Sequence, residues 1–294
     1  MFAPDGKAVF CQPDCQAAYE RLYNIESYLR HMLRWELVGK FAENWTQPID
    51  ERLKEAEERR KHEGNFRVID ADERNLMSYL MLTDIRDTMM EGAVWPLFKD
   101  DWPPLEHFKN TFQLLIALRN KNAHYRAVTA RDLRTLDRIE DNLIDFTARY
   151  GRDRRTIRSV EPDKLPAPFK DPVTNWAQSI TPNAGVWDSL KFGRVGRYLV
   201  VTARAREGSL PSDSIDLLLK AKTDCFFAGF EAASGRLDLY LPMTIGPKQA
   251  ERIIAAARAL QTENVEITEG STDEAPRLDY VFPIEVQLPV GFRP

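Results

Sequence analysis

The stretch AAYERLYNIESYLRHMLRWELVGKF, residues 17–41, decides the fold of the first part of the chain. Apolar side chains recur in it at spacings of three and four residues, namely Leu22, Ile25, Leu29, Leu33 and Leu37. That period places them on one stripe of a helix, and the stripe must be buried against neighbouring helices. The sequence therefore predicts a long amphipathic helix over these residues.

Helical patterns continue to residue 150. Residues 50–63 (DERLKEAEERRKHE) are almost wholly charged, which indicates either an exposed helix held by Glu–Lys and Glu–Arg pairs or a mobile connector. Apolar periodicity predicts further helices over about 72–90 and over about 104–124, the second opened by a proline. Thr129, with Asp132 three residues later, forms a capping-box pattern and marks the start of the last helix.

The composition changes after residue 150. Residues 151–185 combine four arginines, including Arg155, with five prolines, which disfavour a long helix or a central strand. Residues 186–294 mix strand patterns, a hairpin near 225–241, a helix opened by Gly246-Pro247 and strands near 265 and 279. The predicted fold class is α+β. A helical bundle (1–150) is followed by a basic, Pro-rich linker (151–185) and a small α+β domain (186–294).

Composition excludes several classes of protein. The chain has 294 residues, of which 43% are hydrophobic and 29% charged. No apolar run approaches the length of a membrane span, and no secretory signal pattern opens the chain, so a cytoplasmic location is expected. Three cysteines cannot form a disulfide framework. The net charge of -4 argues against wrapping of nucleic acid in bulk, but not against a local basic patch.

The segment LRNKNAHY, residues 118–125, is the best candidate for chemistry. Helical steps of 100° place Asn120 and His124 on one face, whereas Arg119 differs from His124 by about 140° and must reach round to share a site. Histidine exchanges a proton near neutral pH, and arginine braces a crowded anionic phosphorus without losing its charge. Together with a polar amide, these residue types suit cleavage of a phosphodiester.

This arrangement resembles the ribonuclease members of the HEPN superfamily over roughly residues 15–150. Those members carry Arg, four to six residues and then His in the back half of a helical bundle, often with Asn directly after the Arg. Arg119, Asn120 and His124 match. The resemblance implies a homodimeric endoribonuclease that cleaves single-stranded RNA without a metal or other cofactor, through attack of the substrate's own 2′-hydroxyl. It assigns proton transfer to His124, phosphate stabilisation to Arg119, and orientation to Asn120.

A basic strip surrounds the motif. The segment from Arg119 to Arg138 holds six basic and two acidic residues, although residues 1–150 as a whole carry 22 basic and 26 acidic ones. The strip predicts phosphate contacts with RNA, unless it is simply a solvated helix face. The predicted RNA-binding residues are Lys121, Arg126, Arg131, Arg134 and Arg155.

Prokaryotic relatives in this superfamily often act as toxins or in defence against phage, held off by an antitoxin or a sensor domain. That role and such a partner are implied here by the resemblance alone. Toxins that are silenced by adenylylation carry Tyr two places after the His, whereas Arg126 stands there in this chain. We therefore do not expect that switch.

Two other interpretations of the motif stay open. The first is a catalytically inactive HEPN-like bundle that mediates dimerisation or docks a partner, with a C-terminal domain that recognises a ligand or a protein. The second is a purely structural Arg–His pair, or a histidine favoured by the dipole at the end of a helix. Cys11 and Cys15 have no second pair of ligands at zinc spacing, and no ATP or NAD motif is present, so no metal or cofactor is predicted.

Overall fold

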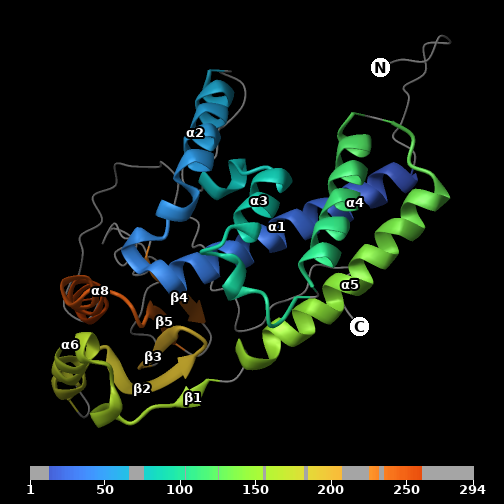
Figure 1. Ribbon diagram of the computed structural model, residues 1–294. Coiled ribbons are helices and arrows are strands. Elements are labelled where there is room, and N and C mark those ends of the chain that lie inside the picture. The colour runs from blue at the N-terminus through green and yellow to red at the C-terminus, as the bar shows by residue number, and fades with distance from the viewer. Residues whose placement is uncertain are drawn as a thin grey trace. The chain divides into compact units, whose positions relative to one another are not determined.

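The computed structural model describes residues 13–65, 76–102, 104–124, 126–154, 157–181, 185–206, 225–231 and 235–259 (Figure 1). These residues form two compact units. The first unit contains the described residues up to Leu33 and from Pro48 to Arg152, and the second contains Arg34–Gln47 and the described residues from Asp153 onward. Both helices and an antiparallel sheet are present, so the predicted α+β class is confirmed.

The first unit is helical, as predicted. Its helices are α1 (Pro13–Phe41, as far as Leu33), α2 (Asp50–Gly64), α3 (Leu82–Met90), α4 (Leu105–Ala123) and α5 (Ala130–Arg154). Every member of the predicted apolar stripe of α1 is at most 5% exposed. An aromatic cluster completes this core and consists of Trp102, Phe108, Phe112 and Phe146.

The charged segment at 50–63 is a helix, which decides between the two alternatives that its sequence allowed. Pairs between residues three or four apart line its surface, such as Lys54 with Asp50 and Arg59 with Glu55. Exposed pairs of this kind contribute little each. The buried side chains of Leu53 and Ala56 anchor the helix to the unit, and their burial is the larger stabilising effect.

The helix predicted over about 72–90 is shorter in the structure. A 3₁₀ turn (Leu76–Tyr79) precedes α3, and residues 66–75 lie outside the described residues. Asp84 explains where α3 begins, because its carboxylate accepts the backbone N–H of Met81 at 2.8 Å. The Arg59 guanidinium holds the same carboxylate at 2.8 Å.

The predicted start of α5 is confirmed in detail. The backbone N–H of Thr129 donates to Asp132 Oδ2 at 2.7 Å, and the backbone N–H of Asp132 donates back to Thr129 Oγ1 at 3.3 Å. This reciprocal pair satisfies two amide groups that a helix start otherwise leaves open. Pro104 is the N-cap residue of α4, so a proline opens that helix as expected.

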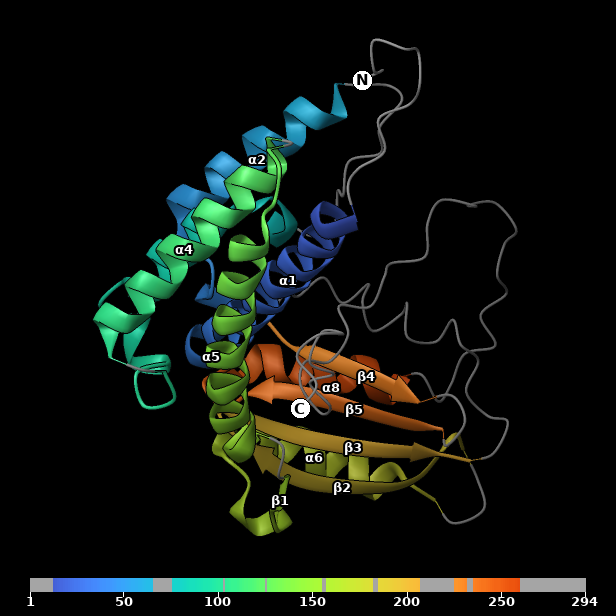
Figure 2. The ribbon, with the colours of Figure 1, turned by 90° about the vertical axis from the view of Figure 1, so that its right-hand side faces the viewer.

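The second unit is built on a five-stranded antiparallel sheet of order β1-β2-β3-β5-β4 (Figure 2). The strands are β1 (Arg158–Ser159), β2 (Trp187–Val195), β3 (Tyr198–Ala205), β4 (Phe227–Glu231) and β5 (Arg236–Pro242). The predicted hairpin is β4–β5, in register from Phe227 opposite Tyr240 to Glu231 opposite Arg236. Strands predicted near 265 and 279 lie outside the described residues.

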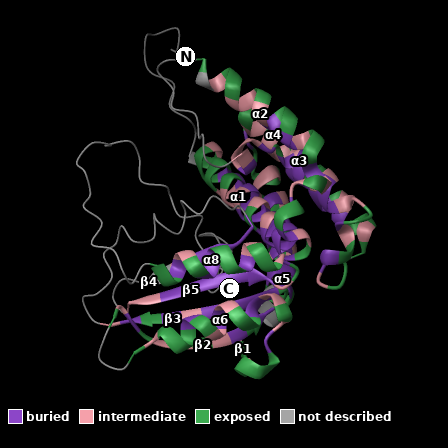
Figure 3. Cartoon of the chain, turned by 90° about the vertical axis from the view of Figure 1, so that its left-hand side faces the viewer, coloured by how far each residue is buried: buried purple, intermediate pink, exposed green. Residues whose placement is uncertain are grey.

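Two helices cover one face of this sheet, α6 (Ala167–Ser179) and α8 (Pro247–Ala259). They lie behind the strands in Figure 2 and in front of them in Figure 3. Alternate residues of β3 and β5 point to this face and are buried with the helices, namely Leu199, Val201, Ala203, Leu237, Leu239 and Leu241. The predicted helix after Gly246-Pro247 is α8.

The opposite face of the sheet packs on the end of α1. The Trp35 ring lies 4.0 Å from that of Tyr198, 5.1 Å from that of Phe227 and 5.7 Å from that of Tyr240, measured between ring centroids. The buried Tyr198 hydroxyl donates to the carbonyl of Trp35. Burial raises the pKa of that hydroxyl far above its usual value. A side chain on Gly39 would meet the Tyr198 ring at 2.8 Å, so only glycine allows this approach.

The structure differs from the predicted domain division in two places. The segment 151–185 is not only a linker, because α6 lies within it and buries Phe169, Val173 and Trp176 in the core of the second unit. Residues 34–47 also belong to that unit rather than to the bundle. Pro166 is the N-cap residue of α6 and Pro168 lies in the first turn, where no helical N–H is needed, so these prolines start the helix instead of preventing it.

Candidate functional site

The predicted motif lies at the C-terminal end of α4. His124 is the C-cap residue and donates its backbone N–H to the carbonyl of Asn120 at 3.1 Å. The chain then turns, and the N–H of Arg126 bonds to the carbonyl of Lys121 at 3.0 Å. These bonds fix the helix end, and they leave the side chains of Asn120 and His124 exposed to solvent.

Arg119 lies on a different side of α4, toward α1. Its Nε atom is 3.8 Å from Glu26 Oε2, and its side chain is 33% exposed. Among the described residues, no hydrogen bond or ion pair joins Arg119 to Asn120 or His124. The structure therefore brings Asn120 and His124 to one exposed helix end and holds Arg119 beside Glu26.

Glu26 is the centre of a small charged cluster. It is 8% exposed and pairs with Arg30 as well as with Arg119. Arg30 also donates to the carbonyl of Leu80, at 3.0 Å from Nε and 2.8 Å from the terminal nitrogen. Burial lowers the pKa of Arg30, and the negative charge of Glu26 partly raises it again. Arg30 nevertheless stays charged at any physiological pH, as arginines do. Two cations thus share one carboxylate, which leaves the cluster positive.

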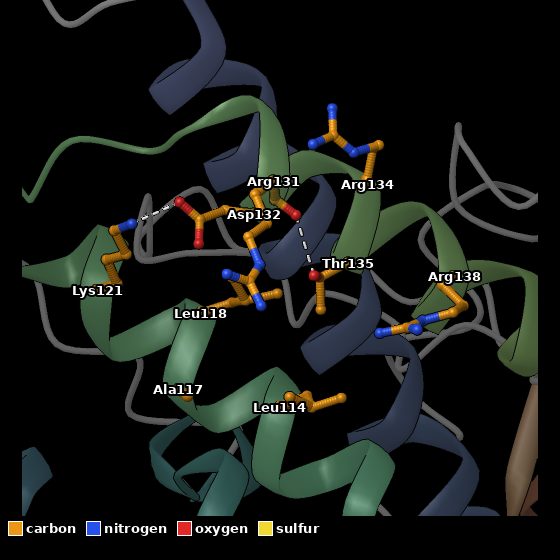
Figure 4. Close-up of a pocket in the computed structure, with 9 residues that line it drawn as sticks. All are labelled: Leu114, Ala117, Leu118, Lys121, Arg131, Asp132, Arg134, Thr135 and Arg138. Carbon is orange, nitrogen blue, oxygen red and sulfur yellow. Dashed lines mark hydrogen bonds and ion pairs between the residues drawn. The ribbon is translucent and has the colours of Figure 1, made fainter.

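A pocket of about 710 Å³ lies between α4 and α5 (Figure 4). Its α4 side consists of Leu114, Ala117, Leu118 and Lys121. Its α5 side consists of Arg131, Asp132, Arg134, Thr135 and Arg138. The wall on α4 is therefore mostly apolar and that on α5 mostly cationic. An apolar surface beside several cations suits a ligand that carries both flat rings and phosphates.

The charges of this pocket are unevenly paired. Lys121 forms an ion pair with Asp132, the only acidic side chain in the lining. Arg131, Arg134 and Arg138 make no ion pair with any residue in the part of the chain that the structure describes, and all three are exposed. Figure 4 shows the Arg131 side chain extending from α5 toward α4. Three guanidinium groups are thus available to an anion.

Most of the predicted RNA-binding residues gather here. Lys121, Arg131 and Arg134 line the pocket, Arg126 is exposed on the connection between the two helices, and Arg155 lies outside the described residues. Arg138 belongs to the predicted basic strip but not to the predicted RNA-binding residues, and the apolar wall was not predicted. Spacing could have revealed them, since Leu114, Leu118 and Lys121 share one helix face, as do Arg131, Arg134 and Arg138.

Asp132 serves both the pocket and the start of α5, which predicts a pH-dependent effect on stability. Hydrogen bonds from Lys121 and Thr129 lower the pKa of Asp132 from 3.8 to about 2. Because the pKa is lower in the folded state, the carboxylate stabilises the fold above about pH 4, and that contribution is lost as the pH falls toward 2. We expect Asp132→Asn to lower the free energy of unfolding by about 0.5–1 kcal/mol at pH 7.

Urea unfolding of the wild type and of Asp132→Asn at pH 7, 4 and 3 measures the difference in the free energy of unfolding. This difference should become smaller below pH 4. The matched control is Asp141→Asn, an exposed carboxylate further along the same helix. A difference that is the same at pH 7 and pH 3 would show that Asp132 does not act through its charge.

Within the described residues, no cluster of three or more His, Cys, Asp or Glu side chains could hold a metal ion. Cys11 lies outside the described residues, and Cys15 is a free cysteine on α1. No helix in the same residues has the length and apolar character that crossing a bilayer requires.

Comparisons of the chain with protein-family models, with curated proteins and with solved structures give no match. Any function must therefore be argued from the residues of the chain itself. The α4–α5 pocket and the helix end that carries His124 are its strongest features.

Proposed function

We propose that the protein is an endoribonuclease that cleaves single-stranded RNA without a metal ion. The observation that carries the proposal is the α4–α5 pocket, lined on one side by apolar residues and on the other by three arginines that make no ion pair within the described residues. His124 follows the pocket-lining Lys121 by three residues and is exposed at the end of the same helix. Phosphates bound along the pocket would thus lie near a residue that exchanges protons at neutral pH. The resemblance of the motif to HEPN ribonucleases supports the same reaction.

The proposed reaction needs only the RNA and side chains of this protein. The 2′-hydroxyl oxygen attacks the adjacent phosphorus, and the bond from phosphorus to the 5′-oxygen breaks. The 2′-hydroxyl loses its proton in this step, and the leaving 5′-oxygen gains a proton. His124 transfers protons in this exchange, and Asn120 orients the imidazole or the phosphate. The products are a 2′,3′-cyclic phosphate and a 5′-hydroxyl. DNA has no 2′-hydroxyl and cannot react this way.

Arg119 is proposed to stabilise the negative charge that builds up on the phosphate. Its contact with Glu26 is long, at 3.8 Å, and involves only Nε. Its two terminal nitrogens form no hydrogen bond within the described residues, so they remain available to an oxyanion. In the proposal, a homodimer would bring Arg119 of one copy near His124 of the other, as the resemblance implies.

Cleavage of RNA by the purified protein in EDTA tests the proposal. We expect an unstructured RNA to be cut to fragments with cyclic phosphate ends, and DNA of the same sequence to stay intact. Analysis of the product ends by mass spectrometry identifies the reaction. Equal cleavage of RNA and DNA, or activity that EDTA abolishes, would contradict the proposed chemistry.

A second candidate function is that of an inactive HEPN-like bundle that binds a partner. The position of Arg119 favours it, because Glu26 engages Arg119 on a side of α4 away from His124. In that case the folded protein cuts no RNA, but it forms a stable complex with itself, an antitoxin or a sensor protein. A role as a toxin or in defence against phage belongs to the first candidate and rests on the resemblance.

A further inference from the structure

Two exposed aromatic side chains, Tyr19 and Tyr23, lie on the same face of α1 as Glu26. Four large hydrophobic residues are exposed among the residues that the structure describes, namely Tyr19, Tyr23, Met81 and Leu114. Leu114 belongs to the α4–α5 pocket. Tyr19 and Tyr23 share a face of α1 with Glu26 and Arg30, and Met81 adjoins Leu80, whose carbonyl binds Arg30. We call Tyr19, Tyr23 and Met81, with Arg30 and Arg119, the tyrosine patch.

The two tyrosines form a stacked pair on the surface of α1. Their ring centroids are 6.5 Å apart, their planes differ by 21°, and the residues are 60% and 58% exposed. Residues four apart lie one above the other on a helix, so α1 itself holds the rings in line. Nearly parallel aromatic rings that stay open to solvent are surfaces on which unpaired bases stack.

Arginines lie beside this pair. Tyr23 precedes Glu26 by three residues on the same helix face, and Tyr23 and Arg30 are close enough to interact electrostatically. Glu26 joins Arg30 to Arg119. Met81 follows Leu80, whose carbonyl accepts two hydrogen bonds from Arg30. The exposed ring faces thus lie on the helix face of α1 whose Glu26 holds the part-exposed Arg119.

We propose that the tyrosine patch binds a base of single-stranded RNA next to the phosphate that Arg119 stabilises. This inference rests on the proposed function, since Arg119 is assigned there to the phosphate. Exposed tyrosine, methionine and arginine also occur in protein interfaces. The parallel rings, on the face of α1 whose Glu26 holds Arg119, favour a nucleotide, in which a flat base and a charged phosphate are joined by one sugar. The patch gives the enzyme a preference for unpaired bases, because a base within a duplex cannot reach the rings.

The test compares how tightly the full-length protein binds two strands of equal charge. One is a short 2′-O-methyl RNA, which cannot be cleaved by 2′-hydroxyl attack, and the other is an abasic 2′-O-methyl strand with the same number of phosphates. We expect Tyr19→Ala combined with Tyr23→Ala to weaken binding of the RNA by roughly 5- to 150-fold. Binding of the abasic strand should stay within about twofold, because its phosphate contacts are intact.

Tyr19→Phe combined with Tyr23→Phe is the matched variant, since it keeps both rings and should bind the RNA like the wild type. Thermal unfolding shows that all proteins are folded. If the alanine variant loses both strands equally, or neither, the tyrosine patch does not stack bases. If the variant instead changes only the oligomeric state in sedimentation, the patch is a protein interface and the inference is wrong. If the wild type binds neither strand, the proposed function fails as well.

Discussion

Replacement of His124 by alanine should reduce the rate of RNA cleavage by roughly 10²- to 10⁴-fold, the usual contribution of a positioned general acid or base. The side chain is exposed at the end of α4, so its loss leaves no cavity and should not change the fold. Binding of RNA should also persist, because the arginines of the α4–α5 pocket are untouched. Single-turnover cleavage rates, measured with saturating enzyme in EDTA, separate the chemical step from binding.

Two further variants make this result specific. His107 is exposed near the other end of the same helix, and His107→Ala should cleave RNA at the wild-type rate. The opposite of the His124→Ala result is expected when alanine replaces Arg131, Arg134 and Arg138 together. RNA binding should weaken and depend less on salt concentration, whereas the single-turnover cleavage rate at saturating enzyme should stay the same. A folded His124→Ala protein that is as active as the wild type would remove His124 from the site.

The helical bundle was predictable because its signals are local. The stripe of α1 and the Thr129–Asp132 capping box depend only on residues three and four apart, and the structure confirms both. The β4–β5 hairpin is likewise a local pattern. What the sequence did not reveal was that the end of α1 packs on a sheet through Tyr198 of β3, which lies 163 residues after Trp35. The two units divide within α1, after Leu33. The spacing of apolar residues does not change there, so it does not show that Trp35 belongs to a different unit from Leu33.

The prediction of a linker over 151–185 misses α6, because the number of prolines does not show whether they start or interrupt a helix. Their positions matter more than their number, since a helix start tolerates proline and a helix interior does not. In α6 two prolines stand at the start and one, Pro172, inside, while Phe169, Val173 and Trp176 follow a helical spacing that the sequence already contained. Their burial against the sheet offsets the hydrogen bond that Pro172 cannot make.

The candidate site was predictable as a set of residue types, but not as an arrangement. The cationic residues of α5 gather as expected because they recur along one helix face. The direction of Arg119 could not be foreseen, because it depends on Glu26 of α1, which lies 93 residues earlier in the chain. The tyrosine patch was missed for a related reason, since the spacing of Tyr19 and Tyr23 along α1 does not show that both rings are exposed.

The largest effect on stability should come from Trp35→Ala, which should lower the free energy of unfolding by about 3–5 kcal/mol. The indole is 1% exposed and packs against Tyr198, Phe227 and Tyr240, so its removal leaves a cavity on the face of the sheet that α6 and α8 do not cover. Urea unfolding followed by circular dichroism measures the loss.

Two variants test whether this loss reflects packing on the sheet rather than an effect on α1 itself. Trp35→Phe should recover part of the stability, because a smaller ring still fills some of the space between Tyr198 and Phe227. Tyr23→Ala removes an exposed ring from the same helix and should cost no more than about 0.5 kcal/mol. Equal losses in Trp35→Ala and Tyr23→Ala would mean that residues 34–47 are not part of the sheet's core. A loss confined to Trp35 would show that this segment of α1 completes the second unit, because Trp35 packs against the tyrosines of β3 and β5.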